Sequence, residues 1–297
     1  MSTGIFFHYQ RGERLKDFPQ ALQGILEREE VVFYDAFYPD KPESLLDLPP
    51  IPTEAICRVH SSEMVEGVKK AGVYEGALFS AAGTYQAVLK VWAGELKNAF
   101  VFTGYGDHHA GSHFFGGGCY FNGAAIAIRE LETKNPTLRF AVIDTDAHHG
   151  DGSWELFEND PRVLYVCFCN GASEEKNWNV NIHVPLQITD AEYVGLVKSN
   201  LQERLGDFGP ELIFWNWGYD GTVGEYGDVG LSPESHVRVA SVLKELAEEL
   251  CKGRLIVVLC GGSRRDLASL IIPRVIRVLV GRIVSGFERD GRAQAGR

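Results

Sequence analysis

Short apolar runs alternate with longer segments of helical periodicity along most of the chain. The apolar runs predict strands at residues 4–9, 31–37, 98–103, 140–143, 162–168, 179–184, 211–217 and 255–259. Helical spacing and helix-start residues predict helices at residues 14–26, 61–73, 77–94, 122–132, 153–157, 191–205, 232–251 and 266–280. Strands that alternate with helices are typical of a mostly parallel sheet with helices on both faces, so the pattern predicts an α/β fold.

Prolines limit regular structure in two parts of the chain. Five prolines between residues 39 and 52 exclude long regular structure, and we interpret this stretch as a surface loop. Pro273 falls inside the last predicted helix and is expected to kink or interrupt it. No repeat, low-complexity segment or linker divides the chain. We therefore predict one domain over residues 1–287, followed by a polar, frayed tail at residues 288–297.

Composition narrows the functional class. The 297 residues carry a formal net charge of −11, which argues against a broad nucleic-acid-binding face. No apolar run approaches the length of a membrane span, and the first residues lack the features of a signal peptide. The six cysteines include no Cys-x-x-Cys pair, and we expect them to be reduced. A cytoplasmic protein without nucleic-acid or membrane partners is expected.

Four predicted strands run directly into polar, glycine-rich loops, which follow residues 103, 143, 217 and 259. In open α/β sheets, ligands bind at the carboxyl ends of the strands. The four loops are therefore expected to converge on one site.

The most distinctive of these loops begins at the end of the strand predicted at residues 140–143. Asp144, Asp146 and His148 are spaced two apart, which places their side chains on one face while the chain stays extended. Two carboxylates and an imidazole suit a divalent metal. A simple Asp-Gly turn is the alternative. That alternative does not account for a strand, two carboxylates, two histidines and two glycines within thirteen residues.

A hydrolytic metal site needs a third ligand and a base. The loop after residue 217 offers Asp220, Glu225 and Asp228 as the third ligand. Two carboxylates and one histidine leave an open position for water and substrate.

The adjacent His108 and His109, on a separate loop, are candidates for the base that takes a proton from that water. A catalytic histidine needs an orienting partner on its far nitrogen. Asp144 and Asp151 are available for this role.

Over nearly all of its length the chain resembles the histone deacetylase family, including its bacterial and archaeal members and the acetylpolyamine amidohydrolases. The motifs occur in the family's order. The strongest are Asp107-His108-His109-Ala110, Gly117-Gly118-Cys119-Tyr120-Phe121-Asn122 and residues 144–152, and the weaker ones are Arg58-Val59-His60-Ser61 and Gly218-Tyr219-Asp220 with the later Asp228.

The resemblance implies an arginase-like α/β fold and hydrolysis of acetyl-lysine or related acyl-amides at one Zn²⁺, or in some members Fe²⁺. It implies that Asp146, His148 and Asp228 ligate the metal. The gap before Asp228 is longer than is usual in the family, so Asp220 and Glu225 stay open as alternatives.

The resemblance also assigns the residues around the metal. His108 and His109 match the tandem histidines that handle the proton, and Asp144 and Asp151 match their carboxylate partners. Asp144 is further implied to help bind a structural K⁺, with backbone carbonyls near Cys167. His149 matches a position that is not a ligand, and we interpret it as structural.

The chain departs from the family at Ser263, where relatives carry a tyrosine whose hydroxyl contacts the substrate carbonyl. A serine hydroxyl is too short to reach the same point, and one lost oxyanion donor costs about 2.7–4 kcal/mol. Gly118 stands where many relatives carry an aromatic residue. We expect the substrate pocket to involve Gly118, Ser263, Arg264 and Tyr219, and the candidates to replace the missing contact are Tyr219, Tyr226, Arg264 and Arg265.

Two functional hypotheses follow. The first is a metal-dependent hydrolase of an acylated amine, either a small molecule or an acyl-lysine, with a preference for anionic acyl groups because an arginine fork binds carboxylates. The second is a catalytically impaired metal-binding protein that recognises acylated ligands, for which Ser263 is the main support. The paired histidines favour the hydrolase, because a protein that only binds has no need of a base.

Overall fold

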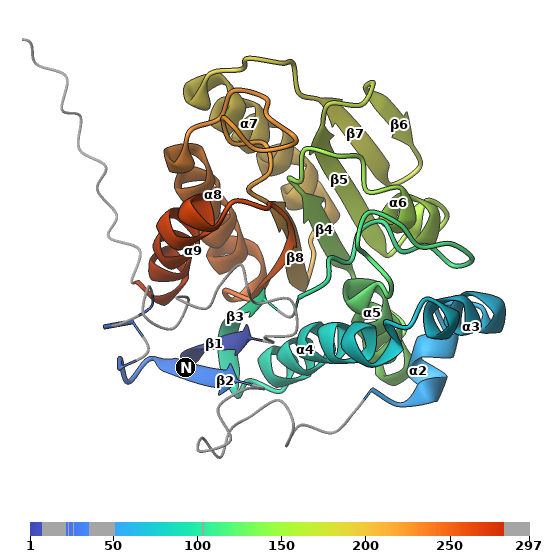
Figure 1. Cartoon of the computed structure of the whole chain (residues 1–297). Coiled ribbons are helices and arrows are strands. Elements are labelled where there is room, and N and C mark those ends of the chain that lie inside the picture. The colour runs from blue at the N-terminus through green and yellow to red at the C-terminus, as the bar shows by residue number, and fades with distance from the viewer. Residues whose placement is uncertain (8–21, 23, 26, 36–50, 103, 282–297) are drawn as a thin grey trace, which may run out of the picture.

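The structure is a computed structural model that describes residues 1–7, 22, 24–25, 27–35, 51–102 and 104–281. Its strands form one sheet (Figure 1) in the order β2-β1-β3-β9-β8-β4-β5-β7-β6. Neighbouring strands are parallel except for β6, which pairs with β7 in the antiparallel sense. The strands are β1 (Ser2–Phe7), β2 (Val31–Asp35), β3 (Leu96–Phe102), β4 (Phe140–Asp144), β5 (Val163–Cys169), β6 (Glu174–Lys176), β7 (Asn179–His183), β8 (Leu212–Gly218) and β9 (Leu255–Gly261).

Helices follow most strands along the chain, as the pattern predicts. Their order confirms the predicted mostly parallel α/β fold. The described helices are α2 (Thr53–Cys57), α3 (Ser62–Lys70), α4 (Tyr74–Trp92), α5 (Gly123–Lys134), α6 (Asp151–Phe157), α7 (Asp190–Phe208), α8 (Pro233–Cys251) and α9 (Arg265–Val280).

Several predictions differ from the structure or fall outside it. The short helix α2 and the edge strand β6 were not predicted, since each is too short to show a clear hydrophobic period. Helix α9 continues through Pro273 without the expected interruption. Pro273 is buried in the core with the rest of that helix face, and this packing offsets the missing backbone donor. The helix predicted at residues 14–26, the prolines up to residue 50 and the tail at residues 288–297 lie almost wholly outside the described residues.

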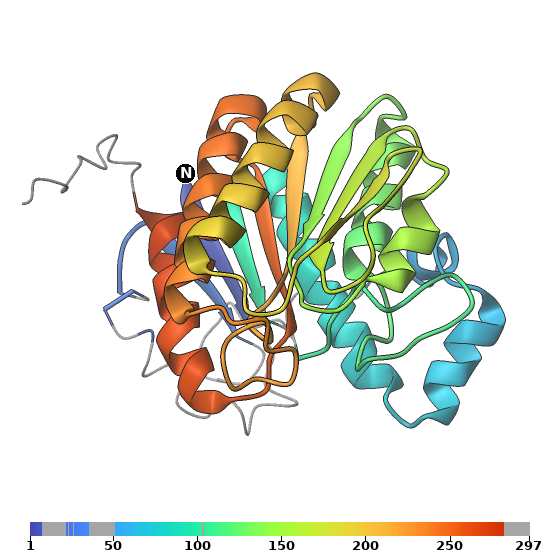
Figure 2. The ribbon, with the colours of Figure 1, turned by 90° about the horizontal axis from the view of Figure 1, so that it is seen from above.

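Strands β4, β5 and β8 are buried on both faces, which explains their continuous apolar runs. In β4, Phe140 and Val142 join one hydrophobic core, whereas Ala141 and Ile143 join the other. Helices α7, α8 and α9 pack on the face of Ala141 and Ile143, and helices α2 to α6 pack on the opposite face. Figure 2 shows these helix layers on the two sides of the sheet.

The middle of the sheet positions the loops that carry polar chemistry. Strands β3, β9, β8 and β4 are consecutive neighbours and are parallel. Their carboxyl ends therefore meet at one edge, and this confirms that the loops after residues 103, 143, 217 and 259 lie together. Among the described helices, none is both long and apolar enough to cross a membrane.

Candidate metal and catalytic site

Three side chains from two neighbouring strand ends form a candidate metal centre. One ligand atom from each of Asp146, His148 and Asp220 lies within 4.8 Å of the other two. The Nδ1 atom of His148 is 3.1 Å from Asp146 Oδ1 and 2.8 Å from Asp220 Oδ2. Asp146 and Asp220 are buried, whereas the His148 side chain is partly exposed. The two carboxylates are thus shielded from solvent, and the candidate metal centre is open to solvent on the side of His148.

Glycines make room for the two carboxylates. A Cβ atom added at Gly218 or Gly261 would collide with Asp146, and one added at Gly227 would lie 2.8 Å from Asp220 Oδ2. Gly218 ends β8 and Gly261 ends β9, and the two residues are paired in register. The strand ends therefore form a cradle that only residues without a side chain can line.

The electrostatics of this cradle favour a cation. Burial, together with the neighbouring charge of Asp146, raises the pKa of Asp220 to about 7. The nearby carboxylates of Asp146 and Asp220, which stabilise a protonated ring as acceptors, raise the pKa of His148 to about 10. Within the described part of the chain, Asp220 Oδ2 is buried and accepts no well-formed hydrogen bond, although His148 Nδ1 is close. Two buried carboxylates, one imidazole and an unsatisfied oxygen fit a divalent metal such as Zn²⁺.

The third member of this cluster is Asp220, and Asp228, the residue expected as the third ligand, does not belong to it. Asp228 is exposed, and its carboxylate accepts hydrogen bonds from the backbone N–H groups of Gly224 at 2.8 Å and Gly230 at 2.9 Å. These bonds shape the loop. Asp220 lies two residues after the end of β8, close to Asp146, whereas Asp228 comes eight residues later in the same loop.

Asp144 contacts His108 and does not belong to the cluster of Asp146, His148 and Asp220. Strand β4 ends at Asp144, and the residues that follow form bends, so the three side chains do not stay on one strand face. The Asp144 carboxylate contacts His108 Nδ1 at 3.0 Å and accepts a hydrogen bond from the Tyr165 hydroxyl at 2.8 Å. Asp144 therefore orients His108, in agreement with its expected role as a histidine partner.

His108 is enclosed by carboxylates. Its Nδ1 faces Asp144, and its Nε2 lies 3.8 Å from Asp146. Burial alone would lower the pKa of His108, but the charges of Asp144 and Asp146 outweigh it and raise the pKa to about 10. A histidine held in this way is suited to keep a positive charge beside the metal centre.

His109 occupies the more open position. Its Nδ1 lies 2.6 Å from the carboxylate of Asp151, the first residue of α6. The His109 ring is 4.1 Å from that of His108 and 6.5 Å from that of His148, measured between centroids. A Cβ atom added at Gly117 would collide with the His109 ring. Since Nδ1 is occupied, Nε2 is the nitrogen that can exchange a proton with a ligand.

The loop that carries both histidines is anchored by buried polar contacts. Asp107 accepts a hydrogen bond from the Ala124 N–H at 3.0 Å, in the first turn of α5. His60 contacts the Gly111 carbonyl at 2.8 Å through Nδ1 and accepts the Asn122 N–H at 3.0 Å through Nε2. His60, from one of the weaker motifs, is therefore a structural residue that fixes this loop.

The four expected pocket residues separate into different environments. Gly118 has φ +80° and no atom within 4 Å of the position where a Cβ would lie, so its surroundings are open. Tyr219 is buried, with its ring beneath Gly262, and belongs to the core rather than to a substrate surface. The guanidinium of Arg264 donates two hydrogen bonds to Asp266 at 3.1 Å and 2.6 Å. That carboxylate occupies the arginine fork and leaves less of it for an anionic substrate.

Ser263 and its neighbours are held by a residue that the sequence did not single out for this role. The buried carboxylate of Glu225 accepts the Ser263 hydroxyl at 2.7 Å and the Ser263 N–H at 2.9 Å. The sequence suggests Glu225 only as a possible metal ligand. No spacing rule could have linked it to Ser263, because the contact joins loops from two different strands.

A second group of ligand-type side chains includes His149, the residue after His148. One ring nitrogen of His149 and the sulfur atoms of Cys167 and Cys169 lie within 4.8 Å of one another. Hydrogen bonding from Cys167 lowers the pKa of Cys169 to about 5. Asn181 Oδ1 lies 3.1 Å from Cys169 Sγ and 3.3 Å from His149 Nδ1. These contacts tie the loop after β4 to β7, in keeping with the structural role expected for His149.

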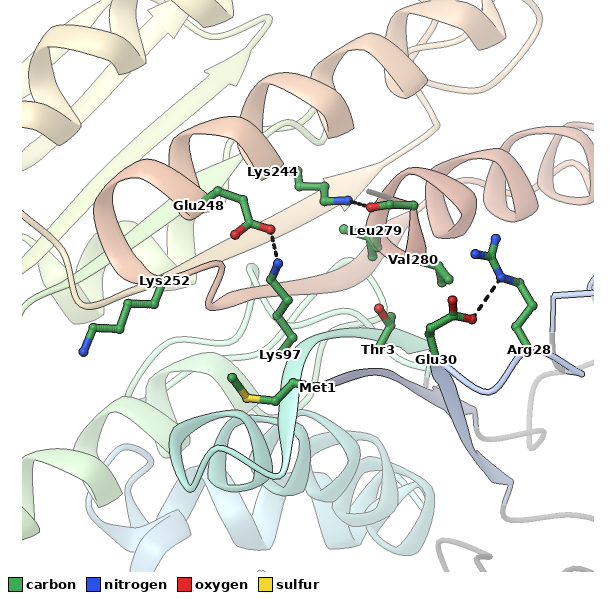
Figure 3. Close-up of a pocket in the computed structure, with 11 residues that line it drawn as sticks. Met1, Thr3, Arg28, Glu30, Lys97, Lys244, Glu248, Lys252, Leu279 and Val280 are labelled. Carbon is green, nitrogen blue, oxygen red and sulfur yellow. Dashed lines mark hydrogen bonds and ion pairs between the residues drawn. The ribbon is translucent and has the colours of Figure 1, made fainter. Parts of the chain in front are cut away.

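A cavity of about 860 Å³ lies at the opposite, amino-terminal edge of the strands (Figure 3). Its charged groups are largely paired, since Lys97 forms an ion pair with Glu248 and the Lys244 amine donates to the Val278 carbonyl at 2.8 Å. Lys244 thereby satisfies the carbonyl end of α9. The cavity is remote from the histidine and carboxylate cluster and has a structural explanation.

Comparison with known proteins identifies the family. The structure matches the crystal structure of the HDA15 HD domain with a TM-score of 0.80 over 95% of this chain and 89% of that one, at 21% identity, so the two share the expected arginase- and deacetylase-like fold. A model of the histone deacetylase domain matches residues 68–279. The chain belongs to the histone deacetylase family.

Individual relatives differ in how much of their length is shared. A probable deacetylase of Archaeoglobus fulgidus is 29% identical over 88% of this chain and 81% of the relative. Histone deacetylase HDA1 of Candida albicans is 30% identical over 70% of this chain. The human histone deacetylase 7 is 26% identical over 73% of this chain. The chain spans 27% and 25% of these last two proteins, respectively, so only their deacetylase-like part is comparable.

Proposed function

We propose that this chain is a metal-dependent hydrolase that removes the acyl group from an acylated amine. One arrangement supports the proposal most strongly: the cluster of Asp146, His148 and Asp220 lies beside two histidines that each have a carboxylate partner. Relatives named as deacetylases support the same reaction class. A protein that only binds a ligand needs a pocket and a metal, but it does not need a base.

Asp146, His148 and Asp220 would hold one divalent ion, for which the family resemblance suggests Zn²⁺ or Fe²⁺. When bound, the ion would lower the pKa of a coordinated water and polarise the acyl carbonyl. The partly exposed side of His148 is the direction from which a substrate can approach. We also keep a structural K⁺ near Asp144 as a proposal, which the resemblance alone supports.

His108 and His109 would have different roles in the proton transfer. His109 Nε2 would take the proton from the attacking water and return one to the leaving amine, because Asp151 holds Nδ1. His108 would act as its electrostatic partner, since it is buried between Asp144 and Asp146. This division follows their exposure: the His108 side chain is 2% exposed, whereas that of His109 is 21% exposed.

The substrate is proposed to be a small acylated amine or an acyl-lysine. The open space at Gly118 suits a group wider than a slim lysine chain. We place the protein in a reducing compartment such as the cytoplasm, since all six cysteines have free thiols.

The alternative is a metal-binding protein that recognises acylated ligands without hydrolysing them. The engagement of the Ser263 hydroxyl by Glu225 favours it, because that hydroxyl is not available to a substrate. The test is turnover of a panel of acyl-amides, including acetyl-lysine peptides and acetylated polyamines, by protein of measured metal content. Turnover that requires the metal and His109 supports the hydrolase. Tight binding of the panel with no turnover would support the alternative.

A further inference from the structure

The hydroxyl of Ser263 is already used inside the protein. It donates to Glu225 Oε2 at 2.7 Å, and the other oxygen of the same carboxylate accepts the Ser263 N–H at 2.9 Å and the Arg264 N–H. Glu225 is only 7% exposed, and hydrogen bonds to a buried carboxylate are among the stronger ones in proteins. A serine hydroxyl has a single proton. Ser263 therefore cannot donate to a substrate without giving up this contact.

Tyr226 follows Glu225 in the loop after β8, and its side chain lies against His148 of the proposed metal centre. Its ring stacks on the His148 imidazole, with centroids 5.4 Å apart and planes inclined by 25°. Its hydroxyl oxygen accepts the Gly262 N–H at 3.0 Å. A phenol that accepts one hydrogen bond still has its own proton to donate, and within the described residues this proton has no acceptor. Tyr226 is 60% exposed, so a ligand can reach it.

Glu225 and Tyr226 thus fix the loop after β9 by accepting hydrogen bonds from three consecutive backbone N–H groups. Tyr226 takes the N–H of Gly262, and Glu225 takes those of Ser263 and Arg264. This contact sets the position of the Tyr226 hydroxyl relative to His148. Two of the other candidates are less suitable, because Tyr219 is buried beneath Gly262 and the fork of Arg264 is held by Asp266.

We propose that Tyr226 donates the hydrogen bond that stabilises the acyl oxygen of the substrate as negative charge develops on it. The proposal rests on the proposed hydrolase function and adds a catalytic residue to it. Hydrolysis of an amide places this charge on the carbonyl oxygen, and a donor fixed in advance beside that atom lowers the barrier. Tyr226 supplies such a donor on the same face as His148, and no covalent step or extra reactant is involved.

The decisive comparison is Tyr226→Phe against Ser263→Ala. The phenylalanine keeps the stacked ring and removes only the hydroxyl, so kcat is expected to fall by about 10²–10³-fold with metal content and KM nearly unchanged. Ser263→Ala is expected to reduce kcat by a much smaller factor, through loosening of the loop alone. A larger loss in Ser263→Ala than in Tyr226→Phe would overturn the proposal.

A binding measurement separates this proposal from the function on which it rests. A trifluoromethyl ketone analogue of an acyl-lysine, which hydrates to mimic the tetrahedral state, is titrated into metal-loaded protein by calorimetry. Tyr226→Phe is expected to weaken its binding by at least tenfold and to leave binding of the unreacted acyl-amide unchanged. If the wild type hydrolyses nothing, the proposed function fails, and the calorimetry still decides the role of Tyr226. Equal affinity of the analogue for both proteins, or no binding to either, would overturn that role.

Discussion

The Nδ1 atom of His148 lies 2.8 Å from Asp220 Oδ2, a buried oxygen that accepts no well-formed hydrogen bond from the described residues. A close approach of two potential ligands without good hydrogen-bond geometry is what a shared metal position requires. Asp220→Asn is therefore expected to weaken metal binding by more than about 100-fold, since even the loss of a residue that only orients a ligand costs about 10–100-fold. Elemental analysis after dialysis against a chelator measures the effect.

Asp228→Asn is the matched control for this experiment. Asp228 lies on the same loop, but its carboxylate accepts backbone N–H groups of Gly224 and Gly230. The substitution is expected to leave metal content intact and to lower the free energy of unfolding by about 1 kcal/mol. Metal loss in Asp228→Asn, with retention in Asp220→Asn, would return the ligand assignment to Asp228.

His109→Ala is expected to abolish most turnover without removing the metal. The side chain has its Nδ1 held by Asp151 at 2.6 Å and does not belong to the ligand cluster. Loss of a positioned acid–base group lowers kcat by about 10²–10⁴-fold. The kcat on the best acyl-amide of the panel, together with metal content, tests this expectation.

His113→Ala provides the control on the same loop. His113 is exposed, and its Nδ1 contacts the Ser112 hydroxyl at 2.7 Å, away from the carboxylates of the site. Its kcat is expected to stay within a few-fold of the wild type. If both variants lose activity equally, distortion of the loop explains the result and the role of His109 as the base is wrong.

The fold could be predicted because its signals are local. Residues 140–143 are uniformly apolar since β4 is buried on both faces, and the helix predicted at residues 232–251 begins as expected, with Ser232 accepting the Glu234 N–H at 3.2 Å and Pro233 at the first helical position. The order of strands within the sheet is a tertiary property, and the predicted segments contain no information on which strands are neighbours.

Site residues that lie in one short segment could be predicted from the sequence. Contacts between side chains from two different loops could not. Asp146 and His148 follow from a single strand end. Whether Asp220 or Asp228 lies beside Asp146 depends on the conformation of the loop after β8. Backbone hydrogen bonds to the Asp228 carboxylate help to fix that conformation. The contact of Glu225 with Ser263 likewise joins residues 38 positions apart. Sequence spacing cannot report such distances.

Gly261→Ala tests whether the glycine cradle is needed for the metal centre. The added Cβ would collide with Asp146 and lie close to Asp220, so the carboxylates must move. Overpacking of this kind costs about 1–3 kcal/mol, and the displaced ligands are expected to hold metal less tightly. Denaturant unfolding and metal analysis measure the two effects. Gly116→Ala is the control, since no atom lies within 4 Å of its Cβ position, and a similar loss of metal in that variant would argue against the cradle.

The buried His60 and His236 are each expected to make the folded state less stable as the pH is lowered from 6.5 to 4, because each ring must stay neutral. Burial lowers the pKa of His60 and of His236 from 6.5 to about 4. Each ring uses one nitrogen as an acceptor: His60 takes the Asn122 N–H at 3.0 Å, and His236 takes the Trp217 indole N–H at 3.1 Å. Protonation would remove these acceptors.

The sign of this effect follows from proton binding. Between pH 6.5 and 4 the unfolded chain binds protons at His60 and His236 that the folded chain does not, so these two residues favour unfolding on acidification. The carboxyl of Asp220, whose pKa is raised to about 7, acts in the opposite direction. Each histidine contributes a loss of about 3 kcal/mol across that window. Urea unfolding at pH 6.5 and at pH 4 should show that His236→Gln, relative to the wild type, is more stable at pH 4 than at pH 6.5, with the exposed His113→Gln as the control. An unchanged slope in His236→Gln would mean that another group controls the acid sensitivity.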